Sequence, residues 1–256
     1  MFTVFVSKNK LIKFFVSTGL ILLGVIVGVL IVFTSVNISA KCDTLPIYRV
    51  STNENKIALT FDVAWGNSDT QQIIDILNEL NVKATFFITG EWASKYPDDV
   101  RAYFDNDHEI GNHSYSHPYP TQISINDLIS DTKKCENEIK KITGVTPALY
   151  RTPYGEYDEN VISTAQGMGY SVIQWDCDSL DWKDLSADEI CSRILPKVKC
   201  GSILLFHTDK ENTHSALPSI IKSLKAEGYE FVTVSNLIYK ENYDIDANGE
   251  QYLVSN

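Results

Sequence analysis

The chain has little positive charge. It carries 22 lysines and arginines against 33 aspartates and glutamates in 256 residues. Three of the bases, Lys8, Lys10 and Lys13, precede residue 41, so the remainder holds 19 bases against 33 acids, a net charge of −14. So acidic a surface repels polyanions. We therefore expect no nucleic acid partner and favour a neutral or amino-bearing polymer.

Charge of either sign is absent between Phe14 and Ala40, where most residues are Leu, Ile, Val or Gly. An apolar run of about 20 residues matches the bilayer core, whereas a signal peptide's apolar region spans only about 7–15 residues. We therefore expect a transmembrane anchor over 14–36, with a signal peptide cleaved after residues 38–40 as the alternative. The preceding lysines predict that residues 1–13 are cytoplasmic and that the following domain is extracytoplasmic, at the cell membrane or, after cleavage, secreted.

Cysteine and histidine are scarce, with five of each. The cysteines form no CxxC pair and no zinc-ribbon spacing, which argues against a cysteine-bound zinc site. A disulfide stays open, and Cys191 and Cys200 are the nearest pair. Two of the histidines, His113 and His117, are four residues apart in His-Ser-Tyr-Ser-His-Pro. On one face of a helical turn, two imidazoles at that spacing can bind one metal ion.

Strand-like and helix-like segments alternate after residue 56, which predicts a parallel sheet in an α/β fold. We expect an incomplete, seven-stranded (β/α) barrel, preceded by the one transmembrane helix; a doubly wound open sheet is the alternative. The domain spans 54–238, after a linker at 37–53 and before an acidic tail at 239–256 that we expect to fray from Lys240. We expect a monomer. The strand-like runs are 57–62, 83–89, 109–113, 148–151, 171–176, 202–207 and 230–234, and the helix-like stretches are 70–80, 93–104, 126–143, 159–168, 187–198 and 216–227.

Polar residues follow five of the strand-like runs. In a barrel of alternating strands and helices, the C-terminal strand ends share one mouth, where active sites are built. There Asp62 is suited to be a general base, Arg151 to hold it ionised, and His207 to protonate a leaving group. Taken alone, Asp62 is better explained as the cap of a turn that follows its strand. Taken alone, Asp181 is as well explained by the capping of a helix over 184–190 as by a catalytic role.

Five ordered motifs resemble those of the polysaccharide deacetylases, the NodB-homology family or carbohydrate esterase family 4. The similarity spans about residues 54–238, and Thr60–Gly66 is most similar to the sporulation-associated, PdaB-like branch. The motifs are Thr60-Phe-Asp62, His113-Ser-Tyr-Ser-His117-Pro, Arg151-Thr-Pro-Tyr154-Gly155, Asp178-Ser-Leu-Asp181-Trp182 and Leu205-Phe-His207.

The resemblance implies a metal-dependent enzyme that removes N-acetyl groups from N-acetylhexosamine units of cell-wall polysaccharide such as peptidoglycan. It implies that His113 and His117 hold the divalent metal. The expected ion is zinc, with cobalt or manganese as the alternatives. It implies a catalytic base, Asp62, oriented by Arg151. The resemblance also implies that the Tyr154 N–H donates to the oxyanion and that His207, kept charged by Asp181, is the acid. It implies that Trp175 and Leu205 form the wall of the acetyl pocket and that the Trp182 ring stacks on the glycan.

At one position the chain departs from the family pattern. The family's first motif has a second aspartate, the third metal ligand, where this chain has Val63. Because valine cannot bind a metal, a three-ligand site becomes a two-histidine site. Asp62 could move onto the metal, or Asn67 or Asp69 could replace the ligand, although Asp69 is also placed to cap the helix starting at Thr70.

Two other function classes stay open beside the active deacetylase. A weakly active or inactive relative would bind glycan without catalysis, with Trp175, Trp182 and Tyr154 as stacking surfaces. A metallo-esterase would remove O-acetyl groups and would need less help from the acid, His207.

Overall fold

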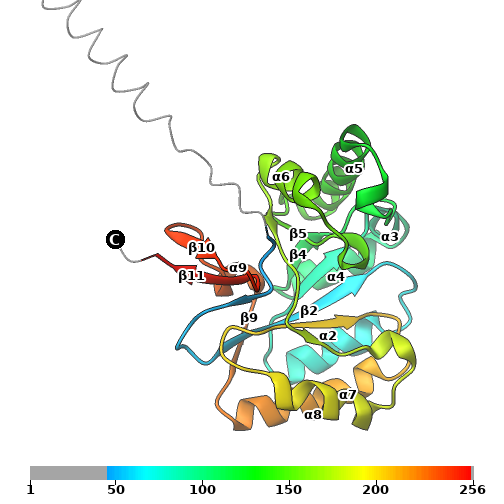
Figure 1. Cartoon of the computed structure of the whole chain (residues 1–256). Helices are drawn as coiled ribbons and strands as arrows, with labels where there is room; N and C mark the ends of the chain where they lie inside the picture. Colours follow the sequence, from blue (N-terminus) through cyan, green and yellow to red (C-terminus); the bar gives the residue numbers. More distant parts are fainter. Residues whose placement is uncertain (1–44, 255–256) are drawn as a thin grey trace, which may run out of the picture. The chain divides into compact units, whose positions relative to one another are not determined.

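The computed structural model describes residues 45–254, which belong to one compact unit (Figure 1). The expected anchor at 14–36 lies outside these residues. Within 45–254, no helix combines the length and apolar character needed to cross a membrane. Cys191 and Cys200 are both free thiols, so the disulfide left open from the sequence is not formed.

Parallel strands form the main sheet, in the order β6-β5-β4-β3-β2-β8-β7, and β9 pairs with β2 (Figure 1). Each of the seven expected strand-like runs contributes a strand to this sheet, which confirms the α/β class. The bounds are β2 Lys56–Val63, β3 Thr85–Ile88, β4 Glu109–Asn112, β5 Leu149–Tyr150, β6 Ser171–Val172, β7 Cys177–Asp178, β8 Ile203–His207 and β9 Glu230–Val232.

The sheet curls into an incomplete barrel because its two edge strands are nearly continuous in sequence. The run expected as one strand over 171–176 pairs with β5 at Val172 and then crosses to β8, where Cys177 pairs with Leu204. Seven flat strands spaced about 4.8 Å apart would put the edges roughly 29 Å apart. The five residue steps from Val172 to Cys177 span at most about 18 Å. A flat, doubly wound sheet is therefore excluded.

Helices cover the outside of the curled sheet in two groups, α2 with α7 and α8, and α3 and α4 with α5 and α6 (Figure 1). The single helix expected over 93–104 is two helices, because Pro97 cannot continue α3 and instead takes the first turn of α4. The bounds are α2 Thr70–Glu79, α3 Gly90–Lys95, α4 Pro97–Asp105, α5 Ile125–Thr143, α6 Glu159–Gly167, α7 Ala187–Ile194, α8 Thr213–Ala226 and α9 Val234–Leu237.

Alternation along the strands separates two buried faces. On β2, Phe61 and Val63 belong to the apolar cluster that packs against the surrounding helices. Ala58 lies on the other face, in a second cluster with Phe87 and Ile203 that fills the inside of the barrel. A parallel sheet buried on both faces explains why its strands read as nearly continuous apolar runs. Thr60 and Asp62 lie two and four residues after Ala58 on the same strand, so their side chains also face inward.

A small second sheet of three strands follows the order β1-β11-β10, with β1 Arg49–Val50, β10 Tyr243–Ile245 and β11 Glu250–Leu253. The expected fraying from Lys240 is therefore wrong for the residues up to 254. The segment before β1 closes the seam of the barrel, since Ile47 N–H donates to Val172 O and Ile47 O accepts from Gln174 N–H. These end segments pair through their backbones, and their sequences have no strong apolar periodicity. For that reason the sequence alone predicts a linker and a tail there.

Candidate active site

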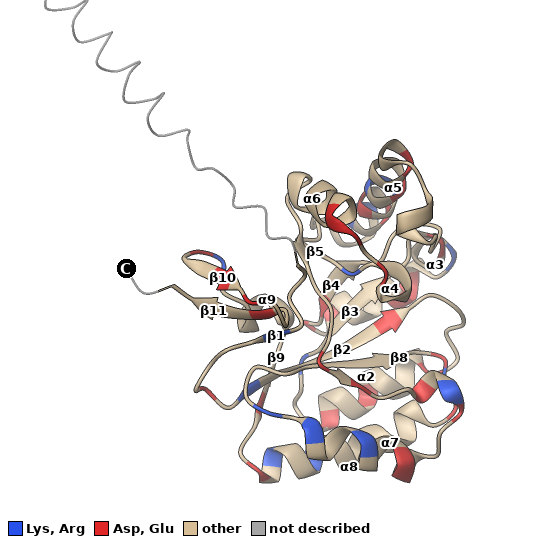
Figure 2. Ribbon diagram, viewed as in Figure 1, with Lys and Arg blue, Asp and Glu red and all other residues tan. Residues whose placement is uncertain are grey.

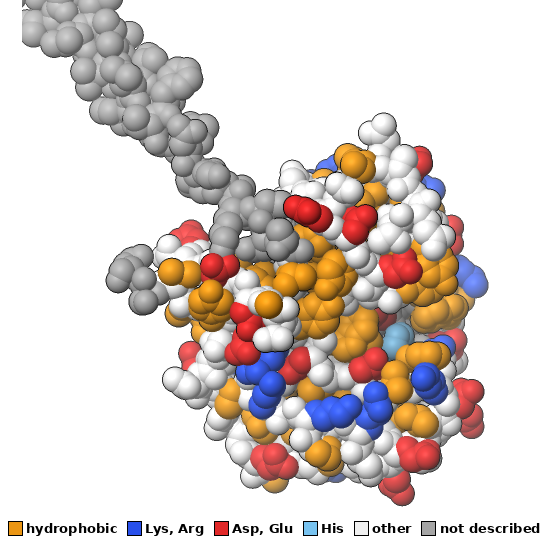
Figure 3. All heavy atoms as spheres, viewed as in Figure 1, with side chains coloured by type: hydrophobic (Ala, Val, Ile, Leu, Met, Phe, Trp, Pro, Cys, Tyr) orange, Lys and Arg blue, Asp and Glu red, His pale blue; other side chains and the backbone are white. Residues whose placement is uncertain are grey.

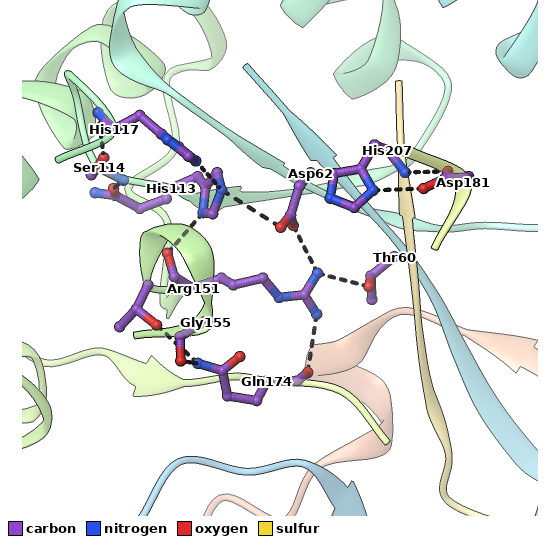
Figure 4. Close-up of polar contacts among 12 residues, drawn as sticks. Thr60, Asp62, His113, Ser114, His117, Arg151, Gly155, Gln174, Asp181 and His207 are labelled. Carbon is purple, nitrogen blue, oxygen red and sulfur yellow. Dashed lines mark hydrogen bonds and ion pairs between the residues drawn. The ribbon is translucent and has the colours of Figure 1, made fainter. Parts of the chain in front are cut away.

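The C-terminal strand ends meet at one pocket of about 580 Å³. Asp62 and His207 are direct register partners on β2 and β8. On the other side, Arg151 follows β5 and donates its backbone N–H to Asn112 O, next to His113. Figure 4 shows these side chains converging from the four strands. The pocket is lined by Asp62, Trp65, His113, His117, Tyr154, Gly155, Trp175, Asp178, Trp182, Leu205, His207 and Lys210.

Arg151 is fully buried and fixes Asp62 from behind. Its Nη1 donates to Asp62 Oδ1 and to Thr60 Oγ1, both at 2.9 Å, and its Nη2 donates to Gln174 O at 3.1 Å (Figure 4). Phe87 lies under the guanidinium at 4.0 Å. Burial acts to raise the pKa of Asp62, but the positive charge and the hydrogen bond of Arg151, together with the neighbouring histidines, outweigh it and hold that pKa below its usual value. Asp62 is therefore ionised and ready to accept a proton.

His113 and His117 point their Nε2 atoms at each other, 3.2 Å apart. His113 Nδ1 lies 2.9 Å from the carbonyl oxygen of Arg151, so Nδ1 carries the proton and Nε2 presents a lone pair. Asp62 Oδ2 lies 3.5 Å from the same Nε2. Burial lowers the pKa of both histidines, that of His117 to about 4, which keeps both neutral at physiological pH.

The histidine pair does not lie on a helical turn, contrary to expectation. Residues 113–119 form a loop in which Ser114 and His117 have φ angles of 66° and 55°. The Asp131 carboxylate, from α5, accepts hydrogen bonds from the Tyr115 and Ser116 N–H groups and fixes this loop. The short spacing of the two histidines therefore acts through a pinned loop rather than through helical periodicity.

Asp181 holds His207 in place through two hydrogen bonds. Asp181 Oδ1 lies 2.7 Å from His207 Nδ1, and Oδ2 accepts from the His207 N–H and from Thr213 Oγ1. Burial acts to lower the pKa of His207, but the hydrogen bond and charge of Asp181 outweigh it and raise that pKa. Asp181 is not a cap of α7, because Ser186 and Glu189 form a capping box there.

Aromatic residues line the pocket on both sides of these groups. Tyr154 adopts φ 60°, in the left-handed region, and its ring meets the edge of His117 at 4.5 Å. Tyr119 stacks on the outer face of Tyr154 at 4.1 Å. Trp175 and Trp182 both line the pocket, and Trp182 is largely exposed. Leu205 is buried at the pocket wall, so the residues predicted to contact substrate do surround one cavity.

Among residues 45–254, neither Asn67 nor Asp69 joins the histidine pair as a third metal ligand. Val63 is fully buried in the outer apolar cluster. Asp69 stands at the N-cap position of α2 but does not cap it, since both of its oxygens accept from the Asp209 N–H at 2.9 Å. Asn67 donates its side-chain amide to Asp99. Within residues 45–254, no three His, Cys, Asp or Glu side chains are grouped to hold a metal ion.

Sequence reasoning missed several residues of the site. Trp65 and Lys210 line the pocket, and Thr60 and Gln174 hold Arg151. Thr60 was detectable, because it lies two residues before Asp62 on a strand and therefore faces the same side. Trp65 and Lys210 lie in loops with no periodic signal, so only the folded structure shows that they meet.

Comparison with known proteins identifies the same family as the sequence motifs. Residues 49–173 match the family described as Polysaccharide deacetylase. A peptidoglycan-N-acetylglucosamine deacetylase of Bacillus cereus is 36% identical over 189 residues, covering 72% of this chain and 69% of that protein. PdaC, a peptidoglycan-N-acetylmuramic acid deacetylase of Bacillus subtilis, is 36% identical over 188 residues, covering 73% of this chain and 40% of that protein. This chain therefore spans less than half the length of the second relative.

Among solved structures, one similar protein is a mutant of a Bacillus anthracis protein described as a CE4 family pseudoenzyme with restored enzymatic activity. It matches with a TM-score of 0.74 and 32% identity, covering 76% of this chain and 71% of that chain. Sequence identity, the curled parallel sheet and the strand-end site all agree. The chain belongs to the polysaccharide deacetylase family, carbohydrate esterase family 4, whose enzymes are hydrolases acting on carbon–nitrogen bonds.

Proposed function

We propose that the chain removes acetyl groups from N-acetylhexosamine units of a peptidoglycan-like cell-wall glycan. One observation carries the proposal: a base and an acid face the same pocket as register partners, and their pKa values are shifted in opposite directions. The Asp62 pKa is lowered, which favours its ionised form, and the His207 pKa is raised, which favours its protonated form. Two groups whose surroundings separate their pKa values in this way suit acid–base catalysis.

The proton transfers follow from this arrangement. Asp62 takes a proton from water as the water oxygen attacks the acetamide carbon. The Tyr154 N–H stabilises the negative charge that develops on the carbonyl oxygen. His207, whose Nδ1 is bound to Asp181, donates its Nε2 proton to the departing nitrogen. The carbon–nitrogen bond breaks, and acetate and a free amine leave.

A divalent metal ion fits part of this site. The two Nε2 atoms of His113 and His117 lie 3.2 Å apart, beside Asp62 Oδ2, a spacing that suits two nitrogen ligands of one metal ion. When bound, the ion would polarise the acetamide carbonyl as a Lewis acid. The donor chemistry suits zinc, with cobalt and manganese as alternatives. Val63 leaves the site one protein ligand short, which predicts weaker metal binding.

A second candidate function is glycan binding with little or no catalysis. Val63 in place of a ligand favours it, and so does the likeness to a protein described as a pseudoenzyme. The exposed rings of Trp182 and Tyr154 offer stacking surfaces for sugar rings. This alternative predicts that glycan binding survives Asp62→Asn and His207→Ala.

Acetate release from an acetylated glycan tests the two functions. The full-length chain is assayed with zinc, cobalt or manganese on peptidoglycan and on N-acetylglucosamine oligomers, beside Asp62→Asn and His207→Ala. Release by the wild type that both variants abolish supports the deacetylase. Retained glycan binding with no release by the wild type under any metal would move the assignment to a binding protein.

We propose, in addition, that the enzyme acts outside the cytoplasm while anchored in the cell membrane by residues 14–36. The support is in the sequence, where an uncharged apolar segment follows three lysines. Fractionation of cells and protease treatment of intact protoplasts test this. Recovery of the full-length chain in the soluble cytoplasmic fraction would overturn it.

A further inference from the structure

A tryptophan and a lysine that no family motif includes meet at the rim of the pocket. The ammonium of Lys210 lies 4.6 Å from the centre of the Trp65 ring, a cation–π distance. The same ring lies 5.7 Å from the His117 ring and 6.3 Å from the His207 ring. Trp65 is 50% exposed. The Trp65 ring therefore lies between the solvent and two histidines of the pocket, His117 and His207.

The two loops that carry this pair are cross-linked. Asp209 accepts hydrogen bonds from the Gly66 N–H at 3.0 Å and from Ser68 Oγ at 2.7 Å. Asp69 accepts from the Asp209 N–H in return. A Cβ at residue 66 would lie 2.3 Å from the Asp209 carboxylate, so a larger residue there would displace that carboxylate. The loop after β2, with Trp65, is thus held against the loop after β8, with Lys210.

Lys210 is the one lysine or arginine among the residues that line the pocket. It forms no salt bridge with any residue in the part of the chain that the structure describes. The other strongly charged lining side chains are acids, Asp62 and Asp178, and Asp62 is already paired with Arg151. Acids outnumber bases in the domain, and residues of both signs are spread over its helices and loops (Figure 2). The ammonium of Lys210, which forms no salt bridge within residues 45–254, is therefore available to an anionic ligand.

The viewed face of the domain carries apolar, acidic and basic side chains (Figure 3). Hydrophobic side chains gather at the centre of this face, with a histidine visible beside them and both acidic and basic side chains around them. Such surroundings disfavour an anion wherever no cation compensates it. Lys210 places such a cation at the rim of the pocket, over the Trp65 ring.

We propose that Trp65 and Lys210 form a subsite for a carboxylate carried by the substrate's hexosamine ring. The proposal rests on the proposed function and narrows its substrate class. Of the two acetylated sugars of peptidoglycan, only the muramic acid unit carries a carboxylate, on its lactyl ether; the glucosamine unit is uncharged. The subsite therefore selects N-acetylmuramic acid units whose lactyl carboxylate is free, because an amide at that position has no negative charge.

Isothermal titration calorimetry of the full-length chain tests the subsite without requiring catalysis. The probes are a peptide-free tetrasaccharide of alternating N-acetylglucosamine and N-acetylmuramic acid, the same tetrasaccharide with its lactyl groups amidated, and tetra-N-acetylchitotetraose. We expect the free-carboxylate form to bind about tenfold more tightly than either neutral probe, with a preference that shrinks as salt is added. Lys210→Gln should bring the three affinities within about twofold, and Lys210→Arg should keep the preference.

The matched control is Lys183→Gln. Lys183 also lies over a tryptophan of the rim, 4.9 Å from the Trp182 ring, but it does not line the pocket, so its loss should leave the preference intact. Equal affinities in the wild type, or a preference that persists in Lys210→Gln, would overturn the subsite while leaving the proposed function standing. Binding of none of the three probes would overturn both.

Discussion

Asp62 and Val63 are neighbours on β2, yet their side chains lie on opposite faces of the sheet. Asp62 faces the pocket, where it contacts Arg151 and His113. Val63 lies in the outer apolar cluster, and its carbonyl accepts the Thr89 N–H at 3.0 Å. The ladder of β2 with β3 thus continues through the position where the family pattern has a metal ligand.

We expect Val63→Asp to lower the free energy of unfolding by about 2–4 kcal/mol in metal-free buffer, because it buries a carboxylate among apolar side chains. The isosteric Val63→Thr should cost less, about 1–2 kcal/mol, since it buries only a hydroxyl. Denaturant unfolding with and without zinc provides the measurement. If Val63→Asp is as stable as the wild type without metal, residue 63 faces the pocket after all.

Asp62→Asn should reduce the rate of acetate release at least about 100-fold, the lower range for loss of a general base. It should also lower the free energy of unfolding by about 3–5 kcal/mol, because the buried guanidinium of Arg151 loses its counter-charge. Initial rates and denaturant curves measured on the same preparation give both numbers. Asp75→Asn, on the exposed side of α2, is the control and should change neither.

Arg151→Lys should shift the acidic limb of the pH–rate profile to higher pH. The guanidinium fork contacts Thr60, Asp62 and Gln174 together, and a single ammonium cannot reach all three acceptors. With a weaker positive partner, the pKa of Asp62 rises, so the base becomes protonated earlier as the pH falls. An unchanged acidic limb in this variant would show that Asp62 does not depend on Arg151 for its charge.

The alternation of apolar runs predicts most strands of the main sheet, and the ordered motifs name side chains that the structure brings to one pocket. Both signals are local: a strand alternates every two residues, and a motif occupies a few consecutive positions. The hydrogen bonds from the Asp209 N–H to the Asp69 carboxylate join loops about 140 residues apart. No local pattern encodes such a contact. The same limit applies to Trp65 with Lys210, and to β1 with β11 at the two ends of the described chain.

The pair of His207 and Asp181 sets the basic limb of the pH–rate profile. His207 must be protonated to serve as the acid, so activity is lost as the pH rises through its pKa, which Asp181 holds above the usual 6.5. In Asp181→Asn the charge that raises this pKa is gone, while the burial that lowers it remains. The basic limb should therefore move to lower pH, and the rate at neutral pH should fall.

A pH–rate profile over the neutral and alkaline range, combined with NMR titration of the His207 ring, measures this shift directly. Asp184→Asn, an exposed change three residues along the same loop, serves as the control and should leave the limb in place. A basic limb that stays where it is in Asp181→Asn, while the His207 ring titrates at lower pH, would remove His207 from the role of acid. If the basic limb and the NMR titration of the His207 ring both move to lower pH, His207 is the group that donates the proton to the departing amine. Both measurements would then report the same ionisation.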